Sequence, residues 1–290
     1  MKLAAKFNLL FLVVFTVGLV AAAFLSQRLL EQSAREETLE NARLIMETAS
    51  AARTYTSTQI APLLKAASMT AFLPQTVPAY SATEELNVVR ERFPDYAYKE
   101  AALNPTNLRD RAVDWEADVV NRFRQYPAER ELVGDRETPS GRSLFLARSI
   151  QIKDPACLEC HSTAAAAPKP MIALYGTANG FGWKLDEIIG AQIVSVPETL
   201  PLRRARQALY TFMAVSASLL LALLVALNLM LRAIVVRPVG RLARAADDVS
   251  LGKIDAADLP VHGSDELSLL AQSFNRMKKS LAHAIKMLDE

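Results

Sequence analysis

Cys157-Leu158-Glu159-Cys160-His161 is the stretch from which we interpret the rest of the chain. It has the form C-x-x-C-H, the attachment sequence of a c-type haem. Two cysteines at this spacing can each form a thioether with one haem vinyl group, and the adjacent histidine can reach the iron as proximal ligand. The stretch predicts one covalent haem c held by Cys157, Cys160 and His161.

The same five residues have other uses. A structural zinc ion needs four ligands, usually in two separated pairs, but the chain has only 2 cysteines, and its other histidines, His262 and His283, lie far along the sequence. A thioredoxin-like dithiol accompanies a βαβ pattern, and no crossover helix pattern follows the motif here. A plain disulfide would leave the histidine without a role. The dithiol and the disulfide remain the alternatives to haem.

Two uncharged apolar runs, residues 7–25 and 208–231, divide the chain. At 1.5 Å per residue, each is long enough to cross about 30 Å of hydrocarbon, so both are predicted to be transmembrane helices. The first run could instead be a cleaved signal peptide, because residues 21–23 are three alanines. It is longer than the usual apolar region of about 7 to 15 residues, which favours an uncleaved anchor.

The haem motif predicts the orientation of the chain. Haem is attached to C-x-x-C-H on the outer side of the bacterial cytoplasmic membrane, so residues 26–207 are expected in the periplasm. Lys2 and Lys6, before the first apolar run, agree with a cytoplasmic N-terminus. Basic residues flank the second run on both sides and do not decide its direction. We expect a protein of the bacterial inner membrane.

Charge and motif content exclude two classes of function. The chain carries 33 Lys and Arg against 31 Asp and Glu, a net charge of +2, which is too balanced to attract nucleic acid. No nucleophile with a base, phosphate-binding loop or pair of catalytic carboxylates stands out. We therefore expect neither nucleic-acid binding nor enzymatic turnover.

Between the apolar runs, helices should come first and strands later. Helical spacing extends from residue 26 to about residue 64, and Pro62 should end or kink that helix. Further helices are predicted over 82–92 and 110–124, and strands over 143–152 and 188–196. This order predicts an α+β domain with an antiparallel sheet.

Over about residues 42–196, a series of ordered motifs resembles the Tll0287-like haem family. The motifs are Arg53-Thr54-Tyr55-Thr56, Ile60-Ala61-Pro62, Val77-Pro78, Pro94-Asp95-Tyr96, Asn104-Pro105-Thr106-Asn107, Trp115-Glu116, the C-x-x-C-H stretch, Ala167-Pro168, Tyr175-Gly176 and Gly180-Phe181-Gly182-Trp183. The resemblance implies a PAS-like sheet that holds one c-type haem, as in many membrane-bound bacterial sensors. By position, it makes Cys157 and Cys160 the thioether sites and His161 the proximal ligand.

The resemblance leaves the distal side of the haem open. A soluble relative uses a cysteine as distal ligand, whereas this chain has Ser57 and Thr58 at the corresponding place and no third cysteine. The candidate distal ligands are Met69, Met46, Met171, which lies in a proline-rich loop, and Tyr55; each could instead be a packing residue. A vacant or water-bound site is a further alternative. Methionine would favour electron transfer or redox sensing, and an open site would admit a small gas.

One arginine is a candidate for the haem periphery. Arg53 could pair with a haem propionate, because a guanidinium group matches carboxylate geometry. Its alternative is a solvated or capping role.

Residues 232–285 resemble a HAMP domain, with an Arg237-Pro238 start, a connector over 252–263 and a second helix capped by Ser264. Apolar residues in the second helix follow a heptad pattern: Leu267, Leu270, Phe274, Met277, Leu281, Ala284 and Leu288. This all-α coiled coil predicts a homodimer, and an ordinary coiled coil is the alternative to HAMP. Residues 286–290 end the helix, so either the output partner is a separate protein or the chain is shortened.

Together these features predict a PAS-like haem domain over 26–207 between transmembrane helices, followed by HAMP over 232–285. The expected function is a membrane-bound sensor of redox state or of a small gas, which signals through HAMP to a separate cytoplasmic protein. The alternatives are a membrane-anchored c-type cytochrome for electron transfer and a metal-free extracytoplasmic binding module.

Overall fold

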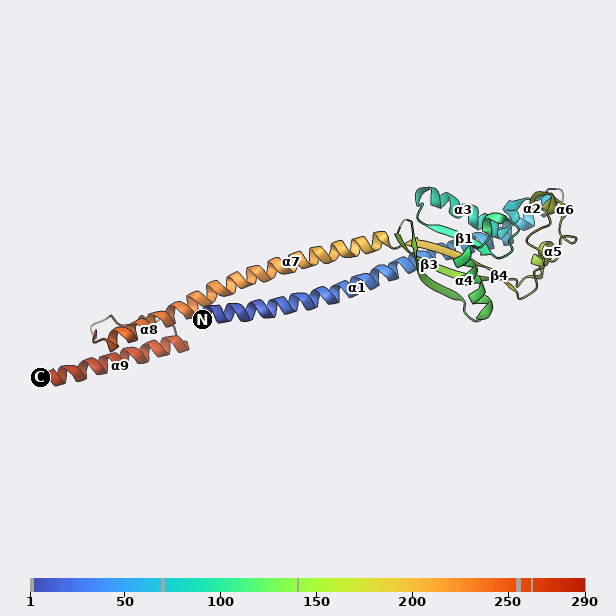
Figure 1. Ribbon diagram of the computed structural model, residues 1–290. Helices are drawn as coiled ribbons and strands as arrows, with labels where there is room; N and C mark the ends of the chain where they lie inside the picture. The colour runs from blue at the N-terminus through green and yellow to red at the C-terminus, as the bar shows by residue number, and fades with distance from the viewer. Residues whose placement is uncertain (1–2, 69–70, 140, 254–256, 262, 290) are drawn as a thin grey trace. The chain divides into compact units, whose positions relative to one another are not determined.

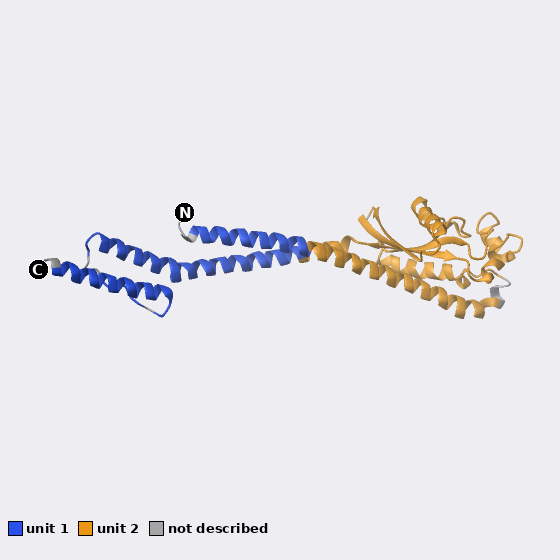
Figure 2. Cartoon of the chain, turned by 90° about the horizontal axis from the view of Figure 1, so that it is seen from below, with its two compact units in different colours: residues 1–26, 209–290 blue, residues 27–208 orange. Residues whose placement is uncertain are grey.

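The computed structural model describes residues 3–68, 71–139, 141–253, 257–261 and 263–289. The chain divides into two compact units, residues 27–208 and residues 1–26 with 209–290 (Figure 2). The element order is shown in Figure 1. The first unit contains the candidate site.

A four-stranded antiparallel sheet forms the centre of the unit 27–208, in the order β1-β4-β3-β2. Its strands are β1 (Ala97–Ala102), β2 (Glu131–Thr138), β3 (Gly141–Gln151) and β4 (Ile188–Pro197). The prediction of an α+β domain with an antiparallel sheet is confirmed. The two long central strands match the predicted ones, whereas the two edge strands were not predicted.

Helices cover both faces of the sheet. Side chains alternate between the faces along each strand, and β3 and β4 place apolar side chains on both, so each face packs against a helix. On one face, α4 (Asp114–Gln125) packs Val120 and Phe123 against β3 and β4. On the other face, the end of α1 (Leu3–Tyr55) packs through Ala42 and Met46. The α1 cluster also contains Leu144, Leu146, Val194 and Val196, all nearly inaccessible to solvent. The sheet and α1 therefore share one hydrophobic core.

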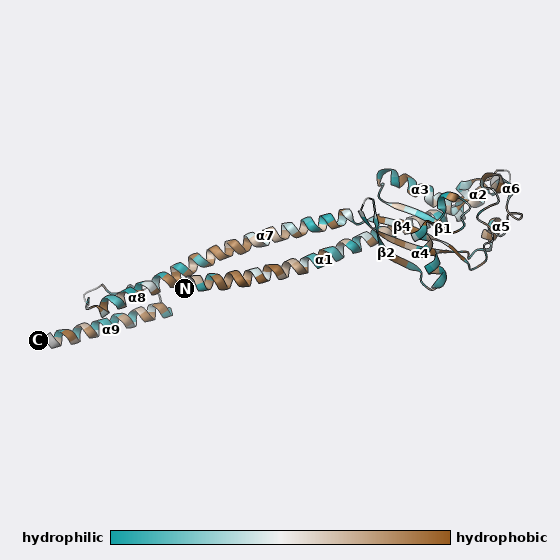
Figure 3. Ribbon diagram, viewed as in Figure 1, coloured by the Kyte–Doolittle hydropathy of each residue, from teal (hydrophilic) through white to brown (hydrophobic). Residues whose placement is uncertain are grey.

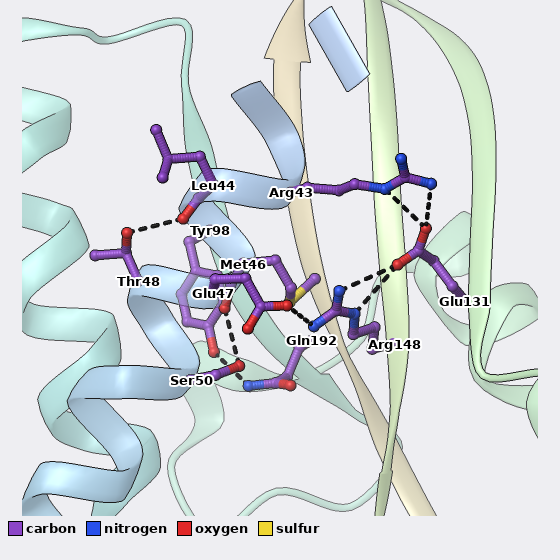
Figure 4. Close-up of polar contacts among 10 residues, drawn as sticks. All are labelled: Arg43, Leu44, Met46, Glu47, Thr48, Ser50, Tyr98, Glu131, Arg148 and Gln192. Atoms are coloured by element: carbon purple, nitrogen blue, oxygen red, sulfur yellow. Dashed lines mark hydrogen bonds and ion pairs between the residues drawn. The ribbon is translucent and has the colours of Figure 1, made fainter. Parts of the chain in front are cut away.

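Ion pairs add to the contact between α1 and the sheet. Arg148 of β3 donates to Glu47 of α1 at 2.7 Å and to Glu131 of β2 at 3.2 Å, and Arg43 of α1 reaches the same Glu131 at 3.2 Å (Figure 4). These pairs are partly exposed, so each contributes at most about 1 kcal/mol to the free energy of unfolding. Their value is geometric, since they fix α1 to two strands at once.

A second charged cluster lies where β4 ends and α7 (Thr199–Leu231) begins. Glu198 is buried there and pairs with Arg142 of β3 at 2.8 Å and with Arg35 of α1 at 3.5 Å. Both arginines also contact Asp135 of β2, at 2.9 and 2.7 Å. Burial raises the pKa of Glu198, although the arginines oppose this. The first residues of α7 are thus tied to α1 through charges.

Around Pro62 the helix changes its winding. Proline has no N–H to donate to the helix, and the five residues Thr56–Ile60 form a π-helical turn in which the Ala61 N–H reaches the Thr56 carbonyl. The helix then continues as α2 (Ala61–Ser68). The predicted kink at Pro62 therefore takes the form of a π turn. The unit also contains α3 (Pro78–Arg92), with 15 residues, and two short helices, α5 (Leu158–His161) and α6 (Lys169–Tyr175).

One predicted loop is a helix. The proline-rich segment around Met171 forms α6, in which Pro170 occupies the first turn. Proline is tolerated there because N–H groups at a helix start have no partner within the helix. Met171 is thus a buried helical residue rather than a loop residue.

The unit 1–26 with 209–290 is helical. It contains the ends of α1 and α7, a π turn (Arg232–Val236), α8 (Arg237–Ser250) and α9 (Glu266–Asp289). Among the residues that the structure describes, two helices are long and apolar enough to cross a membrane, within Ala5–Lys65 and Thr199–Ser250. Figure 3 shows their apolar stretches in brown.

Local hydrogen bonds order the start of α9. Asp265 caps the helix, because its Oδ1 accepts the Ser268 N–H at 2.8 Å; Ser264 was the predicted cap. Asn275 accepts the Leu259 N–H and donates to the Leu259 carbonyl, both at 2.9 Å. The connector is thereby fixed to α9.

Candidate haem-attachment site

The C-x-x-C-H stretch follows β3 and begins in a capped 3-10 turn. The turn, Pro155–Cys157, is capped by Asp154, whose Oδ1 accepts the Ala156 N–H at 2.9 Å. The chain continues directly into α5, which contains Cys160 and His161. Residues three apart in helical backbone lie on the same side, so the two thiols are presented together.

Both cysteines are free thiols and are partly buried. Burial raises the pKa of both groups; for Cys157 the Asp154 carboxylate adds to this and the Arg53 guanidinium partly offsets it. The two side chains are therefore neutral thiols near pH 7. This is the form that adds to a vinyl group, with the thiol hydrogen going to the neighbouring vinyl carbon.

His161 is held in one tautomer by its surroundings. Its Nδ1 lies 2.7 Å from the Gly180 carbonyl oxygen and 3.4 Å from Thr106 Oγ1. A carbonyl oxygen only accepts, so Nδ1 carries the hydrogen and Nε2 keeps its lone pair. Burial also lowers the pKa of His161, which keeps the ring neutral. A neutral imidazole with a fixed Nδ1–H is the form in which histidine binds a metal.

The loop before β4 positions this imidazole. Trp183 stacks on His161 with ring centroids 3.9 Å apart and an angle of 17°. The Trp183 N–H donates to the His161 carbonyl at 3.2 Å, and the Gly182 N–H donates to the Ser162 carbonyl at 3.0 Å. The loop thus contacts both the ring and the backbone of His161.

The turn after β1 holds that loop in place. Asn104 accepts the Gly180 N–H at 3.1 Å and donates to the Phe181 carbonyl at 3.2 Å. The segments Asn104–Asn107 and Gly180–Trp183 therefore meet at His161, although Asn104 and Gly180 lie 76 residues apart in sequence. Sequence reasoning had identified both as motifs but had not assigned either to the histidine.

An apolar wall adjoins the motif. Ala102, Ile152 and Ile189 are buried together, and the side chains packed against them are Ile150, Cys157, Leu158 and Trp183. Such a wall excludes water from one side of the site. The residues present fit a c-type haem: two neutral thiols on one turn, an imidazole with a free Nε2, and adjoining apolar surface.

The candidate distal ligands lie in different environments. Met46 is fully buried in the core between α1 and the sheet, Met171 is 2 % exposed on α6, and Tyr55 is 57 % exposed at the end of α1. Met69 lies outside the described residues. The distal ligand stays a prediction.

The place that corresponds to the relative's distal cysteine lies in the π turn. Thr58 Oγ1 and Ser57 Oγ both donate to the Thr54 carbonyl, at 2.7 and 3.0 Å. Both hydroxyls are thus used by the helix backbone. Single π turns in helices often occur at functional sites, and this one lies at the end of α1.

We expect Asp110, close to the Asn104–Asn107 turn, to give the domain a pH dependence. Burial raises the pKa of Asp110 from 3.8 to about 6, with Arg109 opposing. A raised folded-state pKa means that stability is retained below about pH 4 and is lost as the pH rises through about 6. Asp110→Asn should therefore raise the free energy of unfolding by about 1 to 3 kcal/mol at pH 7.5 and by almost nothing at pH 3.5.

Chemical unfolding of the detergent-solubilised protein at both pH values measures this difference. Asp118→Asn, at an exposed position on α4, is the matched control and should have little effect at either pH. An equal gain from Asp110→Asn at both pH values would contradict ionisation as the cause.

Comparison with known proteins identifies both parts of the chain. The Tll0287-like family model matches residues 31–197, and the HAMP domain model matches residues 230–283. Among solved structures, the cyanobacterial heme-protein Tll0287 is similar, with 15 % identity and a TM-score of 0.44 over 56 % of this chain and 95 % of that one. A search of curated proteins found no match. Because the first family match covers more than half of the sequence, the chain belongs to the Tll0287-like family, and it carries a HAMP domain after the second candidate membrane helix.

Proposed function

We propose that this protein is a membrane-bound sensor with one covalent haem c, which responds to redox state or to a small gas and signals through its HAMP domain. The observation that carries the proposal is the geometry at His161, whose Nδ1 donates to the Gly180 carbonyl and whose Nε2 is left for a metal. A haem bound there would supply an iron that changes oxidation state and can take a further ligand. The solved relative is itself described as a heme-protein.

The chain's own residues would hold the haem and respond to it. Cys157 and Cys160 would fix its edge, His161 would be the iron ligand, and Trp183 would restrict rotation of the imidazole. Any shift of His161 would displace the Gly180–Trp183 loop, which precedes β4 in the chain. From β4 the chain passes through the buried Glu198 into α7, a candidate membrane helix.

The second route runs through α1. This helix shares the α1 cluster with β3 and β4, and its Arg35 pairs with Glu198 at the start of α7. Both candidate membrane helices are therefore tied to the sheet that borders the site. Within a packed core, small shifts favour one of two discrete arrangements over a gradual deformation, and this supports transmission through α1 and α7.

The remaining parts of the proposal concern assembly and location. The sheet would be of the PAS type, the haem domain would lie in the periplasm of a bacterial inner-membrane protein, and HAMP would lie in the cytoplasm. Leu270 and Met277 are 49 % and 56 % exposed in the single chain, and a homodimeric HAMP bundle would bury them. The protein would have no substrate turnover and would act on a separate partner.

Distances between spin labels test the transmission. We expect a label on Gln272→Cys in α9 to give a different inter-protomer distance distribution in the oxidised, reduced and CO-bound protein in nanodiscs. The same label in a Cys157→Ser, Cys160→Ser background, purified without haem, is the control and should not respond. Identical distance distributions in all three states would overturn the proposal that the protein is a sensor. An electron carrier would give that result together with rapid, reversible electron exchange.

A further inference from the structure

A polar pocket of about 210 Å³ adjoins the attachment motif. Its lining combines Arg53 of α1 and Gln192 of β4 with Ser149, Ile150, Gln151 and Lys153 from the end of β3 and the residues after it. Ile150 also packs in the apolar cluster that includes Cys157. The pocket is therefore placed to receive a polar group of anything bound at Cys157.

A buried network fixes Arg53 at the pocket wall. Its Nη1 pairs with the carboxylate of Glu100, which is 6 % exposed. The other oxygen of Glu100 accepts the Tyr98 hydroxyl at 2.8 Å, and Gln192 donates to that hydroxyl at 2.9 Å. Figure 4 shows Tyr98 and Gln192 side by side next to α1. Side chains from α1, β1 and β4 thus hold one guanidinium group in place.

The pocket has unused positive charge. A guanidinium group has five N–H donors, and among the hydrogen bonds of the described residues Arg53 uses only Nη1. Lys153, the second cation of the pocket, has no ion-pair partner within the described part of the chain. The single carboxylate in the network, Glu100, is already engaged by Arg53 and Tyr98. An anion with two acceptor oxygens would satisfy the free donors, and a planar carboxylate fits a guanidinium best.

We propose that this pocket seats a propionate carboxylate of the haem, with Arg53 and Lys153 as its donors. The inference rests on the proposed haem binding, which supplies the carboxylate. It gives α1 a direct contact with the cofactor, because Arg53 lies in the last turn of that helix. A change of charge at the iron would then act on α1 through the propionate as well as on β4 through His161.

Two variants of the full-length haem protein test this assignment. Lys153→Gln removes one positive charge at an exposed residue, and Arg53→Lys keeps the charge opposite Glu100 but removes the planar fork. We expect both to shift the propionate bending band in the resonance Raman spectrum. Lys153→Gln should also lower the midpoint potential, because losing a nearby positive charge favours the ferric state. Arg92→Gln, an exposed charge loss on α3, should change neither quantity.

The outcomes separate this inference from the proposed function. Unchanged propionate bands in both variants would overturn the pocket assignment, even if Lys153→Gln shifted the potential, since a merely nearby charge does that. If Arg53→Lys lowered the melting temperature but left the propionate band unchanged, Arg53 would have a structural role only. That result would also overturn the pocket assignment. Haem missing from the unmodified protein would overturn the proposed function itself.

Discussion

Replacing Cys157 and Cys160 together by serine is expected to abolish covalent haem. A hydroxyl group does not form the thioether, so any cofactor would be held without a covalent bond and would be removed by acidified organic solvent. The stability of the polypeptide should change by no more than about 1 kcal/mol, because both positions are partly exposed. Haem staining of a denaturing gel, after expression with a cytochrome c maturation system, measures the loss.

Single replacements provide the internal comparison. Cys157→Ser and Cys160→Ser each leave one thiol on the same helical turn, so some haem should stay attached to each. Staining of the double variant at the level of the unmodified protein would contradict attachment at this stretch. It would also remove the main support for the proposed function.

Replacing Gly180 by alanine is expected to lower the melting temperature by roughly 5 to 15 °C. The residue has φ of +84°, and an added Cβ would lie 2.1 Å from Thr106 Oγ1 and 2.8 Å from Thr106 Cα. The positive φ costs about 1 to 2 kcal/mol for a non-glycine residue, and the clash with backbone adds about 1 to 3 kcal/mol. The loop must move, and the Gly180 carbonyl moves with it, away from His161.

Gly182→Ala separates strain from clash. Gly182 has φ of +83° and no atom within 4 Å of an added Cβ, so only the conformational cost applies. We expect a smaller fall in melting temperature and an unchanged iron–histidine stretching band, whereas Gly180→Ala should shift that band. Equal effects of the two substitutions would contradict the role given to the close contact with Thr106.

The central strands were predictable and the edge strands were not. Residues 188–196 are rich in β-branched and apolar side chains because β4 is buried on both faces. By contrast, β1 has the sequence Ala-Tyr-Lys-Glu-Ala-Ala, in which only the tyrosine favours strands, and β2 carries four charged residues in eight positions. Pairing with β4 and β3 makes them strands, and that long-range contact leaves little local signal.

The site was predictable only in part. The five residues of the attachment motif are contiguous, so their chemistry is visible in the sequence. The partners of His161 come from Asn104–Asn107 and Gly180–Trp183, and only folding of β1 beside β4 brings these turns together. Gly180 was visible as part of a sequence motif, but its close approach to Thr106 was not. The sequence also did not show that Lys153 lies in one pocket with Arg53, because Arg53 belongs to the distant helix α1.

Peptide mapping of the unmodified protein tests the central claim, that Cys157 and Cys160 carry a covalent haem. We predict that the tryptic peptide beginning at Asp154 contains the whole mass of one haem, keeps its Soret absorbance after acid extraction, and has no thiol available for alkylation. A haem-free peptide in which both thiols are alkylated would contradict covalent attachment. So would a haem-free peptide whose mass is lower by only the two hydrogens lost in a disulfide.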